Sequence, residues 1–335
     1  MKPTNPLVVV LVIFGAGFYF PNAAADDGDS HVGEPLLHYG CCDASAGVGV
    51  SSNLFIVAND EDNLLRVYRR DRSGAPVQAF QVGPFLGVDL RKPESDLEAA
   101  VRVGNRIYWL TSHGRNRKGV DRESRHRFFA TTFKVSDKGV KLKTVGRPYS
   151  HLLDDFIWEP KLARFRLGIA SLHAPKETNA LNIEGLCAGT NGELLIGFRN
   201  PIPEGRALIV PLQNPDGLLH GKRARFGDPI LLDLGGRGVR DMAFADGRYL
   251  IIAGPFDARG HSHLYAWKGG TNAPTKLSDV HFKGSNPEAL VLYPGAPSNE
   301  FQVLSDDGTR KIDGADCKTI KDPAHKWFRS YRIRL

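Results

Sequence analysis

The sequence repeats one short motif, in which an acidic residue precedes a small or apolar pair and an alternating apolar segment follows. The clearest copy starts at Asn182-Ile183-Glu184-Gly185-Leu186 and continues through a turn to an apolar segment, 193–198. Variants occur at 96–100, 239–243 and 286–290, with a weaker copy at 43–47. Repetition of so short a unit restricts the fold to architectures that use one supersecondary unit several times.

Each motif is followed by short segments rich in Val, Ile, Leu, Phe and Tyr, which are bounded by Gly, Asn, Asp or Pro and are typical of β-strands. They form five groups: 35–39, 54–58, 64–69 and 77–82; 97–103, 106–111, 127–135 and 140–145; 183–188, 193–198, 207–212 and 229–234; 239–245, 248–253, 263–267 and 274–280; and 288–293, 300–304 and 327–335. The acids that anchor the last four groups are 86, 57 and 47 residues apart. Four strands at such spacing are typical of a β-propeller blade.

We therefore predict an all-β fold, a β-propeller with five blades, with six blades as the alternative. The long interval between the second and third groups predicts a helical insertion at 150–174, where apolar residues recur at helical spacing. The last group shows three strands, so segment 35–39 is expected to supply the outer strand and close the ring. The predicted propeller is one domain, 34–335, and is expected to be monomeric.

Residues 1–25 are typical of a secretory signal peptide, followed by a polar leader at 26–33. Lys2 precedes a 14-residue apolar run, 7–20, and three alanines end the segment. The run is shorter than the roughly 20 residues that span a bilayer, although an uncleaved N-terminal anchor is the alternative. No later stretch predicts a membrane span, so we expect a secreted or periplasmic protein.

Export would place the four cysteines in an oxidising compartment. Four cysteines allow three pairings, and the sequence does not choose among them. If the chain ends meet, Cys317 could pair with Cys41 or Cys42, whereas Cys187 on a predicted inner strand is expected to be a buried free thiol. The formal charge of +7 is spread along the chain, and without a concentrated basic segment it does not indicate nucleic-acid binding.

In a propeller, the inner strand of each blade begins near the central channel, so equivalent residues form a ring. The expected ring consists of Glu98, Glu184, Asp241 and Glu288, with Ser45 at that point of the weak repeat. The second strand of each blade returns to the same rim, and there we expect Asp60, His113, Arg115, Arg199, Asp257 and Asp306.

Carboxylates that converge without cations repel one another, so this rim requires neutralisation. One solution is a hard cation such as Ca²⁺, which takes six to eight oxygen ligands. Its predicted ligands are Glu98, Glu184, Asp241, Glu288, Asp257 and Asp306. The other solution is a buried salt-bridge network formed by Arg115, Arg199 and Arg240, and the sequence leaves both open.

Four pairs of segments, 95–100 with 108–116, 181–186 with 195–201, 240–241 with 251–255, and 287–290 with 304–308, resemble the bacterial domain-of-unknown-function 3616 family. This resemblance implies a propeller-like fold and no settled activity. The Glu-Gly step is also similar, more weakly, to the esterase-like phytase propellers. The first blade departs from the pattern, since Ser45 stands in place of an acid.

Two functions are consistent with these residues. The first is a metal-assisted hydrolase of an anionic ester, such as a phosphoester, in which the cation activates water, Arg115 and Arg199 clamp the charged group, and His113 is a further catalytic candidate. The alternative is a non-catalytic module that binds a small anionic ligand or an envelope protein and uses its ring for structure. The fold does not decide between them.

Overall fold

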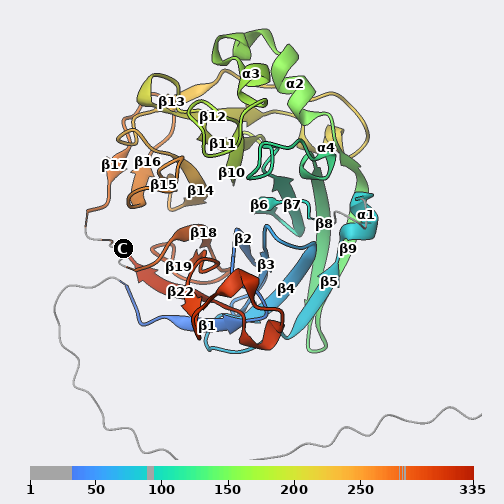
Figure 1. Ribbon diagram of the computed structural model, residues 1–335, viewed down its shortest axis with the longest axis vertical. Helices are drawn as coiled ribbons and strands as arrows, with labels where there is room; N and C mark the ends of the chain where they lie inside the picture. Colours follow the sequence, from blue (N-terminus) through green and yellow to red (C-terminus); the bar gives the residue numbers. More distant parts are fainter. Residues whose placement is uncertain (1–31, 89–93, 279, 281, 283) are drawn as a thin grey trace, which may run out of the picture.

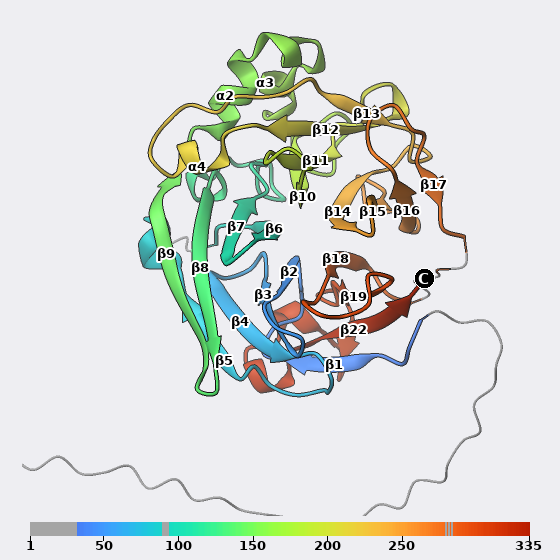
Figure 2. The ribbon, with the colours of Figure 1, turned by 180° about the vertical axis from the view of Figure 1, so that it is seen from behind.

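The computed structural model describes residues 32–88, 94–278, 280, 282 and 284–335, and shows five four-stranded antiparallel sheets around a central axis (Figure 1, Figure 2). This confirms the predicted five-bladed propeller. We number the blades along the chain and give the strands of each from the inner one outward. Blade 1 consists of β2 (Ala46–Gly49), β3 (Leu54–Ala58), β4 (Leu64–Arg69) and β5 (Gln78–Gln81); blade 2 of β6 (Leu97–Val103), β7 (Arg106–Thr111), β8 (Phe128–Ser136) and β9 (Gly139–Tyr149); blade 3 of β10 (Asn182–Ala188), β11 (Leu194–Asn200), β12 (Ala207–Leu212) and β13 (Ile230–Leu232); blade 4 of β14 (Gly238–Ala245), β15 (Arg248–Gly254), β16 (His263–Trp267) and β17 (Thr275–Lys276); and blade 5 of β18 (Pro287–Val291), β19 (Glu300–Ser305), β22 (Trp327–Arg334) and β1 (Leu36–Tyr39).

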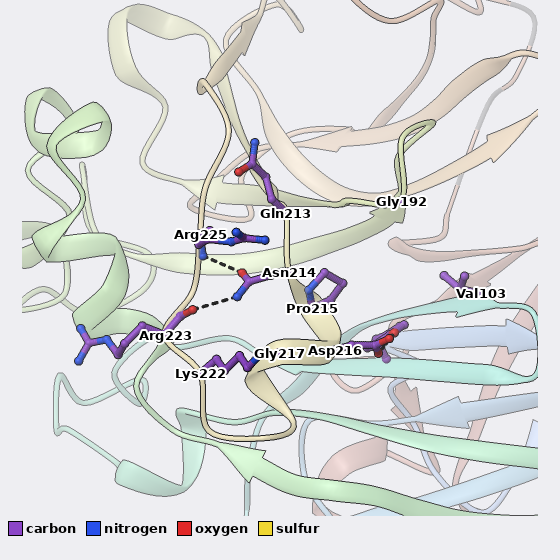
Figure 3. Close-up of a pocket in the computed structure, with 11 residues that line it drawn as sticks. Val103, Gly192, Gln213, Asn214, Pro215, Asp216, Gly217, Lys222, Arg223 and Arg225 are labelled. Carbon is purple, nitrogen blue, oxygen red and sulfur yellow. Dashed lines mark hydrogen bonds between the residues drawn. The ribbon is translucent and has the colours of Figure 1, made fainter.

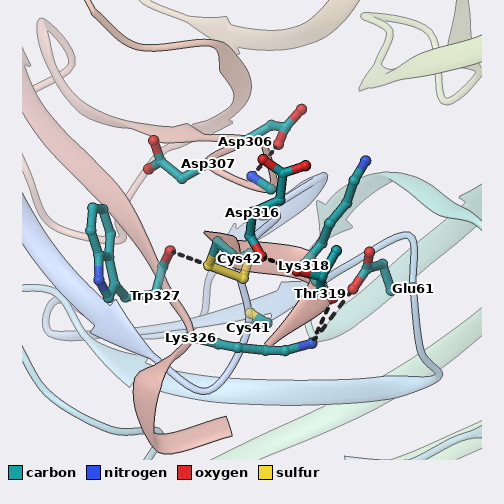
Figure 4. Close-up of a disulfide and its surroundings, with 12 residues drawn as sticks. Cys41, Cys42, Glu61, Asp306, Asp307, Asp316, Lys318, Thr319, Lys326 and Trp327 are labelled. Atoms are coloured by element: carbon teal, nitrogen blue, oxygen red, sulfur yellow. Dashed lines mark hydrogen bonds and ion pairs between the residues drawn. A yellow bond between two sulfur atoms is a disulfide. The ribbon is translucent and has the colours of Figure 1, made fainter. Parts of the chain in front are cut away.

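The ring closes in blade 5, where the N-terminal strand β1 pairs with the C-terminal strand β22. The register places Leu36 opposite Ser330 and Tyr39 opposite Trp327. The predicted closure by segment 35–39 is therefore confirmed. A disulfide between Cys42 and Cys317 adds a covalent link between the start of blade 1 and an insertion in blade 5 (Figure 4).

The remaining cysteines, Cys41 and Cys187, are buried thiols. This confirms the expectation for Cys187 and resolves the pairing that the sequence left open.

The helical segments are short and lie between strands: α1 (Gly83–Leu86), η1 (Glu123–Arg125), α2 (Leu152–Trp158), η2 (Pro160–Phe165), α3 (Leu167–Ala170), η3 (Pro203–Gly205), α4 (Pro215–Leu218), η4 (Cys317–Thr319) and η5 (Pro323–His325). The predicted insertion at 150–174 contains α2, η2 and α3 and packs on blade 3. Phe156 of α2 stacks on Phe226 at 4.8 Å between ring centroids and meets Phe198 edge-on at 5.5 Å. Within the described residues, no helix is long and apolar enough to cross a membrane.

Five separate apolar clusters stabilise the fold, one at each interface between neighbouring blades. The alternation of side chains along each strand sends successive residues to opposite faces, so every blade contributes to two clusters. Between blades 3 and 4 the backbones approach so closely that a Cβ on Gly238 would overlap the Arg199 carbonyl. This close approach brings the inner edges of the blades together around the channel.

Candidate functional site

In four blades, a β-bulge near the start of the inner strand leaves one residue without a partner in the strand register. The register shifts between Leu97 and Ala99, between Ile183 and Gly185, between Val239 and Asp241, and between Pro287 and Ala289. Bulges of this kind re-aim a side chain at functional or structural positions. The bulged residues are Glu98, Glu184, Arg240 and Glu288, and we call these four the bulge ring.

Arg240 joins two glutamates of the bulge ring. Its Nη1 lies 3.2 Å from Glu184 Oε2, and its Nη2 pairs with Glu288 Oε1. Arg199, at the end of β11, donates to Glu184 Oε1 at 2.7 Å. All four side chains are buried, so the carboxylates have lost most of their hydration and depend on these guanidinium groups.

Asparagines two residues before the glutamates complete the hydrogen bonding in blades 3 and 5. Asn182 Nδ2 donates to Glu184 Oε1 at 2.7 Å, and Asn286 Nδ2 donates to Glu288 Oε1 at 3.1 Å. Blade 2 has Asp96 at the same position, and this carboxylate pairs with Arg125 Nη1 at 2.7 Å. Glu98 therefore lacks the amide donor that its counterparts receive.

The predicted member Asp241 lies outside the bulge ring, and Arg240 takes the position in blade 4. Asp241 Oδ2 accepts a hydrogen bond from the Leu290 amide at 2.7 Å on the other side of the strand. Burial raises the pKa of Asp241. The sequence analysis aligned the repeats by their acidic residues and therefore placed Asp241 where Arg240 lies. A shift of one residue along a strand moves the side chain to the opposite face.

Blade 1 contributes Asp43, which lies two residues before Ser45. Asp43 forms an isolated bridge with Asp306 of blade 5, and the two carboxyl groups are hydrogen-bonded to each other. Burial, together with Asp306, raises the pKa of Asp43 to about 12. Asn286 Nδ2 and the Gly308 amide donate to Asp306 at 3.0 and 2.7 Å, so Asp306 keeps the charge while Asp43 holds the shared proton.

Two further carboxylates near this end of the channel lack a cationic partner within the described part of the chain. Glu98 is half-buried and has no ion pair there, and burial followed by Asp96 and Glu184 raises its pKa. Asp60 follows β3, and burial followed by Asp96 and Asp306 raises its pKa. Together with the Asp43–Asp306 pair, Glu98 and Asp60 are called the surplus carboxylates. Oδ1 of Asp43 and Oδ1 of Asp60 are buried without a hydrogen-bond partner among the described residues.

The other predicted rim residues have partners of their own. His113 is buried, its Nδ1 lies 2.8 Å from the Thr111 carbonyl, and burial lowers its pKa to about 3. Arg115 donates to the carbonyls of Ser171 and Gly119 at 2.8 and 3.0 Å. Asp257 pairs with Arg259 at 2.8 Å. Arg125, which the sequence analysis missed, provides the cation for Asp96.

One family model matches part of this chain. Residues 134–292 match the family described as "Protein of unknown function (DUF3616)". The matched stretch makes up just under half of the chain. No curated protein matches the chain.

The DUF3616 stretch includes Glu184, Arg240 and Glu288 of the bulge ring, whereas Glu98 precedes it. Among solved structures, the chain is similar to the PQQ-bound aldose sugar dehydrogenase of Streptomyces coelicolor, with 11% identity over 90% of this chain and 98% of that one and a TM-score of 0.46. It is also similar to virginiamycin B lyase of Staphylococcus aureus, with 8% identity over 90% and 100% of the two chains and a TM-score of 0.39.

The DUF3616 stretch also borders a polar hollow outside the channel, between blades 2 and 3 (Figure 3). It has a volume of about 570 Å³ and lies between Tyr108 and the segment 213–225. Asn214 shapes its wall by donating to the Arg223 carbonyl at 3.0 Å and accepting from the Arg225 amide at 2.7 Å. These two hydrogen bonds fix the conformation of the loop.

The surplus carboxylates predict how stability depends on pH. Between pH 6.5 and 8 the folded state keeps the proton of Asp43, whose pKa is raised to about 12, whereas the unfolded state has lost it. The folded state then binds more protons, so the free energy of unfolding should fall by about 1.4 kcal/mol per pH unit for this carboxyl. Urea unfolding across this range measures the slope.

The Asp43→Asn variant is the control for that slope, because its side-chain amide does not titrate. Its free energy of unfolding should therefore fall less steeply than that of the wild type, by about 1.4 kcal/mol per pH unit. Below pH 6.5, His38 and His113 have the opposite effect, and the free energy of unfolding should fall as the pH falls. Burial lowers their pKa values to about 4 and about 3, so the unfolded state binds more protons there. A wild-type stability that is constant or rises between pH 6.5 and 8 would contradict the shared proton.

Proposed function

We propose that this protein is a non-catalytic binding propeller of the cell envelope, and that the acidic end of its channel takes up a small organic cation. The observation that carries this proposal is the set of surplus carboxylates, which lie beside arginines that already have partners. Oδ1 of Asp43 and Oδ1 of Asp60 are buried without a hydrogen-bond partner among the described residues, and Glu98 has no ion pair there.

The charges around the channel support a cationic ligand. Arg199 and Arg240 are engaged by Glu184 and Glu288, and Arg125 is engaged by Asp96 and Glu94. The surplus carboxylates must then hold protons or a cation, because like charges in a buried site raise each other's pKa values. A ligand ammonium group would replace those protons and gain charge-assisted hydrogen bonds.

The spacing of the carboxylates favours an organic cation over a metal ion. Among the described residues, no group of three or more His, Cys, Asp or Glu side chains is arranged to hold a metal. An ammonium group carries three donors on a flexible stem and can contact acceptors that do not converge on one point. The predicted Ca²⁺ site stays a prediction, which the experiment below also tests.

The predicted hydrolase has less support from the geometry. Its anion clamp would use Arg199, which already donates to Glu184 and to the Pro255 carbonyl. His113 is buried beside His126, with ring centroids 5.6 Å apart, and Arg115 is held by backbone carbonyls. A catalytic role would require these residues to leave their present partners.

Export through residues 1–25 is part of the proposal. The Cys42–Cys317 disulfide supports it, because structural disulfides persist in oxidising compartments such as the periplasm and the extracellular space.

Thermal melts of the mature chain at pH 7.5 test the cation proposal. Putrescine should raise the melting temperature with increasing concentration, since a ligand that binds only the folded state stabilises it, by about 2.7 kcal/mol at 100 times its Kd. Glu98→Gln should weaken the effect, whereas Glu34→Gln, on the exposed segment before β1, should leave it unchanged.

Parallel melts with Ca²⁺, with EDTA and with inorganic phosphate separate the alternatives. Stabilisation by Ca²⁺ and not by putrescine would replace the organic cation with a metal ion. Stabilisation by phosphate alone would indicate an anion site and would support the arginine clamp of the predicted hydrolase. If none of these ligands changes the melt, cation binding at this end of the channel is refuted.

A further inference from the structure

The end of the channel opposite the surplus carboxylates is an apolar cavity of about 390 Å³. All five blades contribute to its lining, through the C-terminal parts of the inner strands β2, β6, β10 and β14 and through the end of β18 and the residues that follow it. Its lining includes Val48, Ala100, Cys187, Met242, Ala243 and Leu290. In β10, Glu184 of the bulge ring and Ala188 of this cavity are separated by roughly 13 Å at 3.3 Å per residue, so the two ends of the channel are distinct sites.

The cavity has the composition of a small-molecule site, which is mostly apolar with few polar groups. Among the lining residues, Arg102 carries the one charge. The thiol of Cys187 stays neutral, because burial raises its pKa. Phe244 is partly exposed beside these residues and adds apolar surface.

Arg102 is held in place by two backbone carbonyls and an aromatic ring. Its Nε donates to the Gly104 carbonyl at 2.8 Å, its Nη1 donates to the Gly49 carbonyl at 3.2 Å, and its guanidinium lies over the Phe133 ring at 5.1 Å. Within the described residues, Nη2 has no partner and no carboxylate pairs with this arginine. A guanidinium fixed in this way retains donors for a carboxylate and loses little side-chain entropy on binding.

We propose that this cavity binds an amphipathic monoanion, whose aliphatic or aromatic body occupies the apolar cavity and whose carboxylate contacts Arg102. The volume lies within the range of about 300–1,000 Å³ that is typical of ligand pockets. The apolar lining excludes a strongly polar body, and the single guanidinium selects a negative head group. This site is independent of the cation site, since it shares no residue with the surplus carboxylates.

Isothermal titration with decanoate, below its aggregation concentration, tests the proposal. We expect saturable binding at one site, with decanol and decyltrimethylammonium weaker by about tenfold or more, because a hydrogen bond to a charged group contributes more than one to a neutral group. Arg102→Gln should reduce decanoate affinity by a similar factor and leave decanol unchanged. Arg334→Gln, which removes an exposed arginine of the blade-5 strand β22, is the matched control and should bind as the wild type does.

A second pair of variants tests where the ligand lies. Ala188→Phe places a ring in the cavity from a half-buried position and should abolish binding of both decanoate and decanol. Leu292→Glu adds a negative charge to the lining and should weaken decanoate but not decanol, so it remains informative if Ala188→Phe does not fold. The proposal is overturned if decanoate does not bind saturably, if decanol binds as tightly, or if the folded Arg102 and cavity variants bind decanoate like the wild type.

Discussion

Replacing Arg240 with methionine is expected to lower the free energy of unfolding by about 3–5 kcal/mol, since it removes one partner of a buried ion-pair network. Arg240 lies between Glu184 and Glu288 and is buried with both of them. Methionine conserves much of the volume but leaves Glu288 without its guanidinium partner, while Glu184 keeps only Arg199. Urea unfolding at pH 7 measures the loss.

Neutralising the glutamates should recover part of that loss. In a chain that carries Arg240→Met, the changes Glu184→Gln and Glu288→Gln remove the uncompensated charges, so the triple variant should be more stable than the single one. Arg334→Met removes an exposed arginine and should change stability by no more than about 0.5 kcal/mol. If Arg240→Met costs less than about 1 kcal/mol, the bulge ring is not the electrostatic centre of the fold.

The blade architecture could be predicted from the sequence because its signals are local. Alternating apolar residues define each strand, and the Gly, Asn, Asp and Pro residues that bound them define the turns. The three-stranded last group also predicted that 35–39 would complete blade 5, and the pairing of Leu36 with Ser330 confirms it. These features follow from chain periodicity and need no knowledge of side-chain contacts.

The composition of the bulge ring could be predicted only in part. Glu98, Glu184 and Glu288 share a bulge that the Glu-containing repeats indicate, whereas in blade 4 the bulged residue is Arg240 rather than its acidic neighbour Asp241. The position of a bulge depends on how neighbouring blades pack, so it cannot be predicted from the sequence of a single strand. The glycine that precedes Arg240 by two residues, where two other blades carry asparagine, was a signal that this blade differs.

The partners of the rim residues depend on longer-range folding. Arg115 fits the repeat spacing, yet the segment after β7 turns away at His113, whose φ is 55°, and returns through η1 to bring Arg125 to Asp96. Likewise, Asp43 meets Asp306 because the ring closes between blades 1 and 5. Contacts between residues so far apart in the chain are not encoded by local periodicity.

Removing the Cys42–Cys317 disulfide is expected to cost about 2–5 kcal/mol. The two cysteines are 275 residues apart, so the bond restricts nearly the whole unfolded chain. The variant should replace both residues with alanine, because a single Cys42→Ala change would leave Cys317 able to pair with the adjacent thiol of Cys41. Urea unfolding under non-reducing conditions measures the loss, and Cys187→Ala provides a control for a buried cysteine outside the disulfide.

The same variant should also weaken the proposed cation site. Asp43 directly follows Cys42, and the Asp307 amide donates to the Cys42 carbonyl at 2.9 Å, which ties Asp306 and its neighbour to this corner (Figure 4). Loss of the disulfide loosens the position of the Asp43–Asp306 pair, so putrescine should stabilise the double alanine variant less than it stabilises the wild type. An unchanged putrescine response, together with an unfolding free energy within about 0.5 kcal/mol of the wild type, would mean that the β1–β22 pairing alone closes the ring and positions these carboxylates.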